Sequence, residues 1–356
     1  MPRFLAALVV WTVCAGYAAA DKPRWTMLVD IGEKQLEGTP LAWSRSQVML
    51  LGRDGRLWDF APGDSSNFRK VSSSFTSYSA AEMQAALLRE LDGDLVVTGT
   101  GHYLVAHPRG KEAWAQRFED LYRSCIHYFG LRKMRLHEPR FPLVAIVWGR
   151  REDFLRYAAR QGTNVQPGVL GFYSPTSNRV TLYDQQASSP GRWEMNDATI
   201  IHEATHQMAF NTGVHNRFAP TPTWLAEGLG TMFEAPGVWD CFTHPSRRER
   251  VNRMRLAEFR AWAKRGRSQG DFVKLLGSDR MFRSNPGAAY SEAWAWTFFL
   301  TEIYPQKFGE YVRRVAARPD FEEYSVARRM ADFTSVFGSD LRMLEKHFLN
   351  FIKGLD

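Results

Sequence analysis

Two histidines and a glutamate near the middle of the chain have the types and the spacing of a metal site. They are His202, Glu203 and His206, in the order His-Glu-x-x-His. With 9 His and 38 Asp and Glu among 356 residues, chance alone would give roughly 0.02 such matches. On a helix, positions i and i+4 lie one turn apart on the same face, so both imidazoles can point at one ion. The glutamate beside the first histidine can then reach a water bound to that ion.

The chain also offers a third ligand, on a second predicted helix that begins at Pro222 with Thr221 as its cap. Glu227 on this helix lies 21 residues beyond His206, which leaves room for one loop between the two helices. Catalytic zinc usually takes three protein ligands and keeps one position open for water. Two imidazoles and this carboxylate would complete such a set.

A zinc ion held in this way predicts hydrolytic chemistry. The ion polarises a scissile carbonyl and lowers the pKa of a water, while Glu203 takes the water proton and passes it to the leaving amine. The simpler interpretation is that His202 and His206 are buried structural histidines and that Glu227 caps a helix. Two histidines, a glutamate and a further acid in this order favour the metal site.

These segments resemble the gluzincin branch of the zincin metallopeptidases. More narrowly, residues 202–207, then 222–228 and the pair 233–234, resemble a bacterial family catalogued as domain of unknown function 1570. The resemblance implies a thermolysin-like core, in which an edge strand, an active-site helix and a glutamate helix surround the metal. It also implies one zinc ion per chain.

The resemblance assigns a role to each motif residue. His202, His206 and Glu227 would be the metal ligands, and Glu203 would be the catalytic base. The third ligand separates this branch from the metzincins, whose third histidine would fall at position 212, where this chain has Thr212.

An oxyanion forms in the transition state of peptide hydrolysis, so a hydrogen-bond donor opposite the metal is expected. Related gluzincins use a Tyr or His downstream of the glutamate helix, and Tyr290 is our candidate for this catalytic role. It begins a long apolar helix that runs through Leu300, and an ordinary core tyrosine is the alternative interpretation. His215 is a second candidate, although its place in a loop favours a surface histidine.

The segment Gly171, Phe172 and Tyr173 lies shortly before the active-site helix. In zincins an edge strand at this place pairs with extended substrate through main-chain hydrogen bonds. A glycine there would allow close approach of a second backbone. These three residues are therefore candidate substrate-binding residues, and a plain hairpin strand is the alternative.

Two further carboxylates are candidates for orienting the ligand histidines. Glu234 lies two helical turns beyond Glu227 and on a similar face. Asp197 lies at the start of the active-site helix, which Asn196 or Asp197 would cap and Gly213 would end. A surface position is the alternative for each carboxylate.

The order of elements predicts an α+β fold. Residues 21–78 read as short strands and turns, with a hairpin from Val48 to Phe60 around Asp54-Gly55, and predict a small β-rich module of SH3-like kind. Residues 79–356 would form the zincin-like domain, with a mixed sheet first and a helical lobe after Asp197.

The N-terminus has the pattern of a signal peptide over residues 1–20. Arg3 is followed by an apolar run from Phe4 to Cys14 and by small residues before Asp21. We therefore expect export to the periplasm or the extracellular space after cleavage near Ala20, with an uncleaved anchor as the alternative.

Cleavage would leave two cysteines, Cys125 and Cys241. An oxidising compartment permits a disulfide between them. Sequence alone does not place them within bonding distance, so two separate buried thiols are an equal alternative.

The net charge of +8 is partly local, with five arginines between Arg247 and Arg255. We interpret this cluster as the solvated face of a helix whose apolar side carries Val251, Met254 and Phe259. A weak association with an anionic envelope surface stays open. We expect no nucleic-acid partner, and we expect a monomer.

The sequence as a whole predicts an exported zinc peptidase that acts on peptides or proteins. Gly-rich phosphate loops, Cys-x-x-Cys pairs and Gly-x-Ser-x-Gly elbows are absent from the sequence, so nucleotide binding and serine hydrolysis have no support. Two alternatives stay open. One is a non-catalytic zinc-containing envelope protein that binds peptides or partners, and the other is a zinc-dependent hydrolase of a non-peptide amide.

Overall fold

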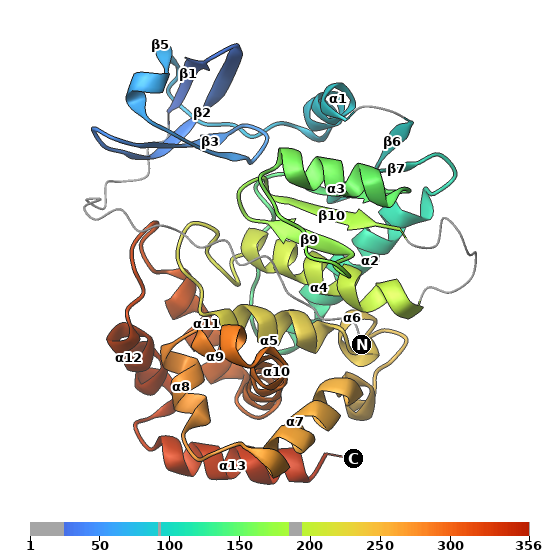
Figure 1. The fold of residues 1–356 in the computed structure, drawn as a ribbon, viewed down its shortest axis with the longest axis vertical. Helices are drawn as coiled ribbons and strands as arrows, with labels where there is room; N and C mark the ends of the chain where they lie inside the picture. Colours follow the sequence, from blue (N-terminus) through green and yellow to red (C-terminus); the bar gives the residue numbers. More distant parts are fainter. Residues whose placement is uncertain (1–24, 92–93, 185–193, 356) are drawn as a thin grey trace.

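The computed structural model describes residues 25–91, 94–184 and 194–355, and in helix α4 it describes side chains from residue 198 onward. It has two sheets followed by a helical C-terminal part (Figure 1). The predicted α+β fold, with a β-rich N-terminal region, a mixed sheet and a helical lobe, is confirmed. The predicted signal peptide lies outside the described residues. Among the described residues, no helix combines the length and the apolar character needed to cross a membrane.

The first sheet is antiparallel, with strand order β4-β3-β2-β1-β5. The predicted hairpin with the Asp54-Gly55 turn is present as β3 and β4, and Gly55 has the positive φ of 83° that favours glycine. Its strands are β1 (Thr26–Ile31), β2 (Lys34–Trp43), β3 (Val48–Gly52), β4 (Leu57–Phe60) and β5 (Ser66–Ser72). The sheet lies inside the predicted module 21–78, whose boundary stays a prediction.

The second sheet carries the elements that lead to the metal ligands, and its strand order is β6-β7-β8-β10-β9. Strands β7, β8 and β10 are parallel, whereas β9 is an edge strand antiparallel to β10. Its strands are β6 (Leu95–Gly99), β7 (Tyr103–Pro108), β8 (Leu143–Trp148), β9 (Gly171–Ser174) and β10 (Arg179–Tyr183).

Helices cover both faces of this sheet (Figure 1). Every residue of β8 is buried because successive side chains point to opposite, covered faces. Leu143, Ala145 and Val147 join the core formed with α2 and α4, whereas Val144 and Ile146 join the core under α1 and α3. The helices are α1 (Ala80–Glu90), α2 (Ala113–Leu131), α3 (Arg151–Arg160) and α4 (Glu194–Asn211).

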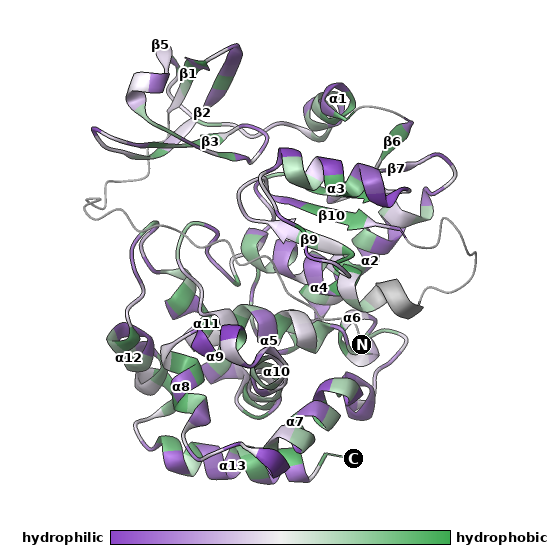
Figure 2. Ribbon diagram, in the orientation of Figure 1, coloured by the Kyte–Doolittle hydropathy of each residue, from purple (hydrophilic) through white to green (hydrophobic). Residues whose placement is uncertain are grey.

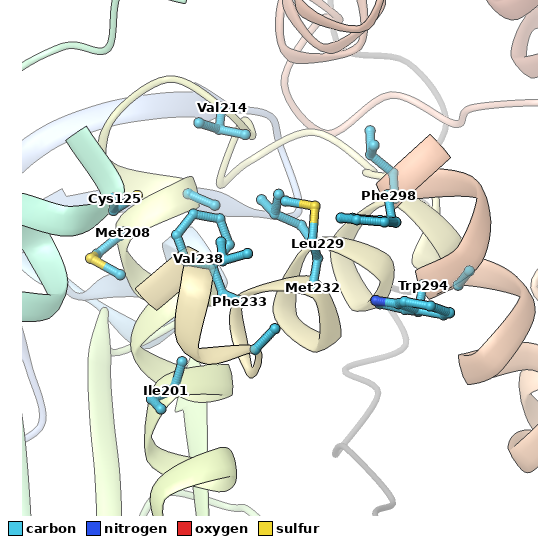
Figure 3. Close-up of a cluster of buried hydrophobic side chains, with 14 of the residues drawn as sticks. Cys125, Ile201, Met208, Val214, Leu229, Met232, Phe233, Val238, Trp294 and Phe298 are labelled. Carbon is cyan, nitrogen blue, oxygen red and sulfur yellow. The ribbon is translucent and has the colours of Figure 1, made fainter. Parts of the chain in front are cut away.

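The C-terminal part is a layer of helices built around α10 (Pro286–Ile303), which is buried along almost all of its length. Its neighbour α5 (Thr223–Phe233) packs between α10 and α4, and Figure 3 shows the apolar side chains at this junction. Figure 2 shows hydrophilic residues on the outer helices α7 and α13. The other α-helices of this part are α6 (Pro236–Trp239), α7 (Arg253–Arg265), α8 (Asp271–Gly277), α9 (Arg280–Ser284), α11 (Pro305–Ala316), α12 (Val326–Phe337) and α13 (Leu341–Lys353).

The solvated helix face predicted for the arginine cluster is wrong in part. Arg255 is buried and lies over the ring of Tyr290, while Met254, which was expected on the apolar side, is 48% exposed. Arg250 donates to Glu302 at 2.9 Å. The cluster spans a short 3-10 helix (Arg247–Arg250) as well as the start of α7, so its side chains do not follow the periodicity of a single α-helix.

Candidate metal centre

Helix α4 carries both histidines and the glutamate of the motif. It begins at Glu194, ahead of the predicted start, and ends at Asn211, after which Gly213 takes a left-handed conformation with φ of 86°. The side chains of Ile201 and Met208 are buried, and they pack α4 against the neighbouring helices (Figure 3). The predicted caps at 196 and 197, and the role suggested for residue 197, lie outside the described side chains.

Helix α5 brings Glu227 to the two histidines. Donor atoms of His202, His206 and Glu227 all lie within 4.8 Å of one another, and the three side chains are buried. The Nε2 atom of His202 is 3.1 Å from Glu227 Oε2, and that of His206 is 3.7 Å from Glu227 Oε1. The structure therefore brings together the three residues that the sequence predicts as ligands.

A second carboxylate fixes the ring of His202. Its Nδ1 atom is 2.9 Å from Glu234 Oε1, which leaves Nε2 facing Glu227. Asn252 donates to Glu234 Oε2 and to the carbonyl of Thr231, both at 2.9 Å. Glu234 thus lies where it can orient the ring of His202, as the sequence suggested. Asn252 was not among the predicted site residues. Its sequence signal is only that of a helix cap before α7.

Glycine at position 230 leaves the space that the His202 ring occupies. A Cβ at Gly230 would lie 2.7 Å from Cε1 of His202, which is closer than side-chain carbons approach. Any other residue at this position would displace the ring. This requirement has no signal in the sequence, because a glycine within a helix belongs to no motif of its own.

Glu203 is buried beside the ligands and points toward strand β9. Its Oε2 accepts a hydrogen bond of 2.7 Å from the backbone N–H of Tyr173. Burial raises the pKa of Glu203, while the nearby charges of His202 and His206 oppose that rise. A carboxylate with a raised pKa holds a proton more readily, as a general base must.

In the absence of an ion, the pKa of each ligand side chain depends on the charges of the other side chains in the site. Burial works against a charged His202, but hydrogen bonds to Glu227 and Glu234 outweigh it and raise the pKa of His202 to about 10. For Glu227, burial is outweighed by the charge of His206 and the hydrogen bond from His202, so its pKa is lowered. A proton on His202 therefore balances the buried carboxylates, and a cation would take over that balance.

Strand β9 turns the backbone groups of two of its three predicted substrate-binding residues away from β10, and one of them, Tyr173, contacts Glu203. The carbonyls of Leu170 and Ser174 accept from the β10 side at 2.7 and 2.8 Å, so the residues that alternate with them, Gly171 and Tyr173, turn their backbone groups away from β10. The side chain of Phe172 packs toward α3 in the second core.

Glycine at 171 has a packing reason of its own. A Cβ there would lie 2.3 Å from Leu182 Cδ2 and 3.0 Å from the carbonyl oxygen of Thr181. A side chain at this position would therefore force Leu182 on β10 to move, whatever approaches the other side of the strand.

The two oxyanion candidates differ in their surroundings. Tyr290 is buried on α10, with its ring edge-on to Phe282 and under the guanidinium of Arg255, so its catalytic role stays a prediction. His215 is only 2% exposed, which makes the surface interpretation wrong. Burial, and then the charge of His206, lower the pKa of His215 to about 3.

The two cysteines are both free thiols in the structure. Cys125 is buried on α2, and Cys241 lies in the loop after α6. Burial raises the pKa of each thiol.

Residues 196–322 match a family model whose description is "Protein of unknown function (DUF1570)". The match spans both helices of the candidate metal centre and confirms the resemblance stated from the motif residues. No curated protein matches the chain.

Solved structures give weak overall likenesses. A variant of the M1 zinc metallopeptidase from Deinococcus radiodurans aligns with 73% of this chain at 15% identity and a TM-score of 0.38. This chain spans about half of that protein, 51% of its length. A functionally unknown conserved protein from Bacillus anthracis str. Ames aligns with 96% of this chain and 72% of its own length, at 12% identity and a TM-score of 0.38.

Proposed function

We propose that this chain, whose residues 196–322 match the family of unknown function described above, is a zinc-dependent peptidase. The observation that carries the proposal is the buried group of His202, His206 and Glu227, with donor atoms within 4.8 Å of one another. Glu203 lies next to the first histidine on the same helix. A ligand set with an acid beside it is the arrangement that metal-assisted hydrolysis needs.

The donor set suits zinc. Two imidazole nitrogens and one carboxylate oxygen are ligands that zinc accepts, and three such ligands leave a position for water or substrate. The hydrogen bond from Nδ1 of His202 to Glu234 leaves Nε2 as the donor atom toward the ion. The excess of buried carboxylates over cations also favours a divalent ion at this point.

The catalytic steps that this chain performs fall mainly to Glu203. Zinc, when bound, polarises the scissile carbonyl and makes a water more acidic. Glu203 takes the proton of that water on its carboxylate and delivers it to the nitrogen of the leaving amine. The N–H of Tyr173 holds one carboxylate oxygen in place at 2.7 Å. The other oxygen is then the one that accepts the proton.

The edge strand supplies the binding mode for a peptide. Gly171 and Tyr173 direct backbone groups away from β10. The N–H of Tyr173 is used by Glu203, so an extended peptide would add to this edge through the backbone groups of Gly171 and the carbonyl of Tyr173. Because Tyr173 also binds Glu203, a peptide on β9 would lie beside the base. This continuity favours a peptide over a non-peptide amide as the substrate.

The test replaces the base and keeps the ligands. Glu203→Gln removes the proton acceptor with little change in volume, so cleavage should fall by roughly two to four orders of magnitude. The measurement is mass-spectrometric digestion of a broad peptide library by the zinc-loaded wild type and variant, with zinc content as the control.

Two results would count against the peptidase. Cleavage that is equal in the wild type and Glu203→Gln would remove Glu203 from the mechanism. No cleavage of any peptide by folded, zinc-loaded wild type would favour the zinc-containing binding protein instead.

A further inference from the structure

A cavity of about 430 Å³ lies beside the C-terminal end of α4. Its wall includes the loop that follows α4, the segment 137–141 and part of α11, and Figure 1 shows that loop between the first sheet and α11. Five basic residues line this cavity, the cationic pocket, and its described lining contains no Asp or Glu. They are His137, Arg140, His215, Arg217 and Arg313.

Arg217 carries a buried charge, and the charge of Asp54 acts on it only from beyond ion-pair distance. Its side chain is 7% exposed, with Nε donating to the carbonyl of Pro175 at 2.5 Å and Nη2 donating to the carbonyls of Gly55 and Thr176. No described carboxylate lies within ion-pair distance of it. Burying a charge without a counter-ion costs free energy, so an anion in the pocket would stabilise this arrangement.

Two further arginines stand at the rim of the pocket. Arg313 donates from Nε to the carbonyl of Gly309 at 3.1 Å, and Arg140 lies over the ring of Phe75. Among the described residues, neither forms an ion pair. The next arginine on α11, Arg314, lies outside the pocket and pairs with a glutamate on its own helix.

His215 connects the pocket to the metal centre. Its backbone N–H donates to the carbonyl of Ala209 at 2.9 Å, one turn beyond His206. The ring is buried, and neither ring nitrogen has a hydrogen-bond partner among the described residues. A neutral imidazole carries one N–H donor, so His215 has a donor without an acceptor in the wall of the pocket.

One side chain in the wall of the pocket also contacts the edge strand. Phe210, which lines the pocket, stacks on the ring of Tyr173 with centroids 5.8 Å apart. Tyr173 in turn donates its backbone N–H to Glu203. The strand along which a peptide would lie is therefore one side chain, that of Phe210, away from the cationic pocket.

Two larger cavities do not have this character. One includes Asp340 and Glu345 in its lining, and the other includes Asp94 and Asp153. Their basic residues thus have carboxylates nearby. Neither cavity includes a residue of α4 or of the loop that follows it.

We propose that the cationic pocket binds a carboxylate of the peptide substrate. Planar guanidinium groups match the two oxygens of a carboxylate, and the N–H donor of His215 adds a second type of contact. The carboxylate can come from the C-terminus of the peptide or from an acidic side chain near the cleaved bond. This inference rests on the proposed peptidase function, because it assigns a substrate preference to that same site.

The test measures binding rather than cleavage. Zinc-loaded Glu203→Gln is titrated into three rhodamine-labelled pools of randomised neutral peptides of equal length, and binding is followed by fluorescence anisotropy. One pool has a free C-terminus, one has an amidated C-terminus, and one is amidated with a single internal glutamate. We expect at least one carboxylate pool to bind about tenfold more tightly than the neutral amidated pool.

Variants of the rim arginines test whether the cationic pocket causes the tighter binding of peptides that carry a carboxylate. Arg140→Gln combined with Arg313→Gln should remove it, whereas the matched control Arg314→Gln should retain it, with circular dichroism confirming that each variant is folded. The pool that binds more tightly shows whether the pocket recognises the C-terminal carboxylate or the side-chain carboxylate of the peptide. Equal binding of all three pools, no binding of any pool, or a preference that survives the double variant would overturn the proposal.

Failure of the pocket proposal can be distinguished from failure of the proposed peptidase function. Carboxylate-dependent binding by a chain whose wild type cleaves nothing would leave the pocket assigned and refute the peptidase. Cleavage of neutral amidated peptides as fast as acidic ones would refute the pocket and leave the peptidase.

Discussion

At the scale of single residues, the candidate site holds buried carboxylates whose negative charge must be compensated by a proton or a metal ion. Glu227 and Glu234 share His202 between them, at 3.1 and 2.9 Å. Without an ion, a proton on His202 compensates these carboxylates and raises the pKa of the imidazole to about 10. Zinc must displace that proton, so metal and proton compete for the same nitrogen.

This competition predicts how the stability of the metal-free chain depends on pH. The folded-state pKa of His202 is about 10 against an ordinary 6.5, so its stabilising contribution is complete below pH 6.5 and is lost as pH rises toward 10. The lowered pKa of Glu227, against an ordinary 4.5, gives a contribution that is lost as pH falls below 4.5. The free energy of unfolding, measured by urea titration, should therefore decrease from pH 6.5 to pH 10.

Two controls accompany this measurement. Glu227→Gln removes a carboxylate that holds the proton on His202, so the decrease should be smaller. Excess zinc should remove the alkaline loss, because deprotonated ligands bind the ion more tightly. A metal-free wild type with constant stability across this range would contradict the coupling.

At the scale of elements, the contact between α5 and α10 sets the position of Glu227. A Cβ at Gly228 would lie 2.2 Å from Thr297 Oγ1 and 2.5 Å from the carbonyl oxygen of Ala293. The two helices therefore approach so closely that only glycine fits between them. The residue next to Gly228 is the third ligand, so helix packing and ligand geometry depend on one position.

Gly228→Ala should consequently lower both stability and zinc affinity. Overpacking of this kind costs about 1–3 kcal/mol, and the shift of α5 would move the Glu227 carboxylate away from the histidines. The matched control is Gly287→Ala on α10, where a Cβ meets nothing within 4 Å and where alanine is the better helix former. Chemical denaturation and zinc titration of both variants test this, and wild-type values for Gly228→Ala would refute the role of the contact.

The sequence predicted the metal-ligand residues and their helices better than it predicted the residues that pack around them. His202, His206 and Glu227 follow from helical periodicity and from a loop of suitable length, because these are local properties of the chain. The burial of His215 does not follow from local pattern, since it depends on α4 packing against segments far away in the sequence. The same is true of Asn252, whose bond to Glu234 joins residues 18 positions apart, on either side of α6 and the 3-10 helix Arg247–Arg250.

At the scale of the whole molecule, the first sheet contacts the turn between β9 and β10 beside the cationic pocket. The backbone N–H of Leu57 donates to the carbonyl of Thr176 at 2.8 Å, and Arg217 joins the turn at Gly55 to the turn after β9. The strand and helix pattern predicted the α+β class and the position of both sheets along the chain. It did not predict this contact, because a buried arginine that binds carbonyl groups has no sequence signature.

The central claim is that His202, His206 and Glu227 together hold one zinc ion, and metal analysis of the purified chain tests it most directly. After incubation with zinc and removal of the excess, the wild type and Glu203→Gln should each retain about one zinc per chain, whereas His206→Ala and Glu227→Gln should lose most of it. Folded wild type that retains no zinc, or folded ligand variants that retain as much zinc as the wild type, would contradict the account.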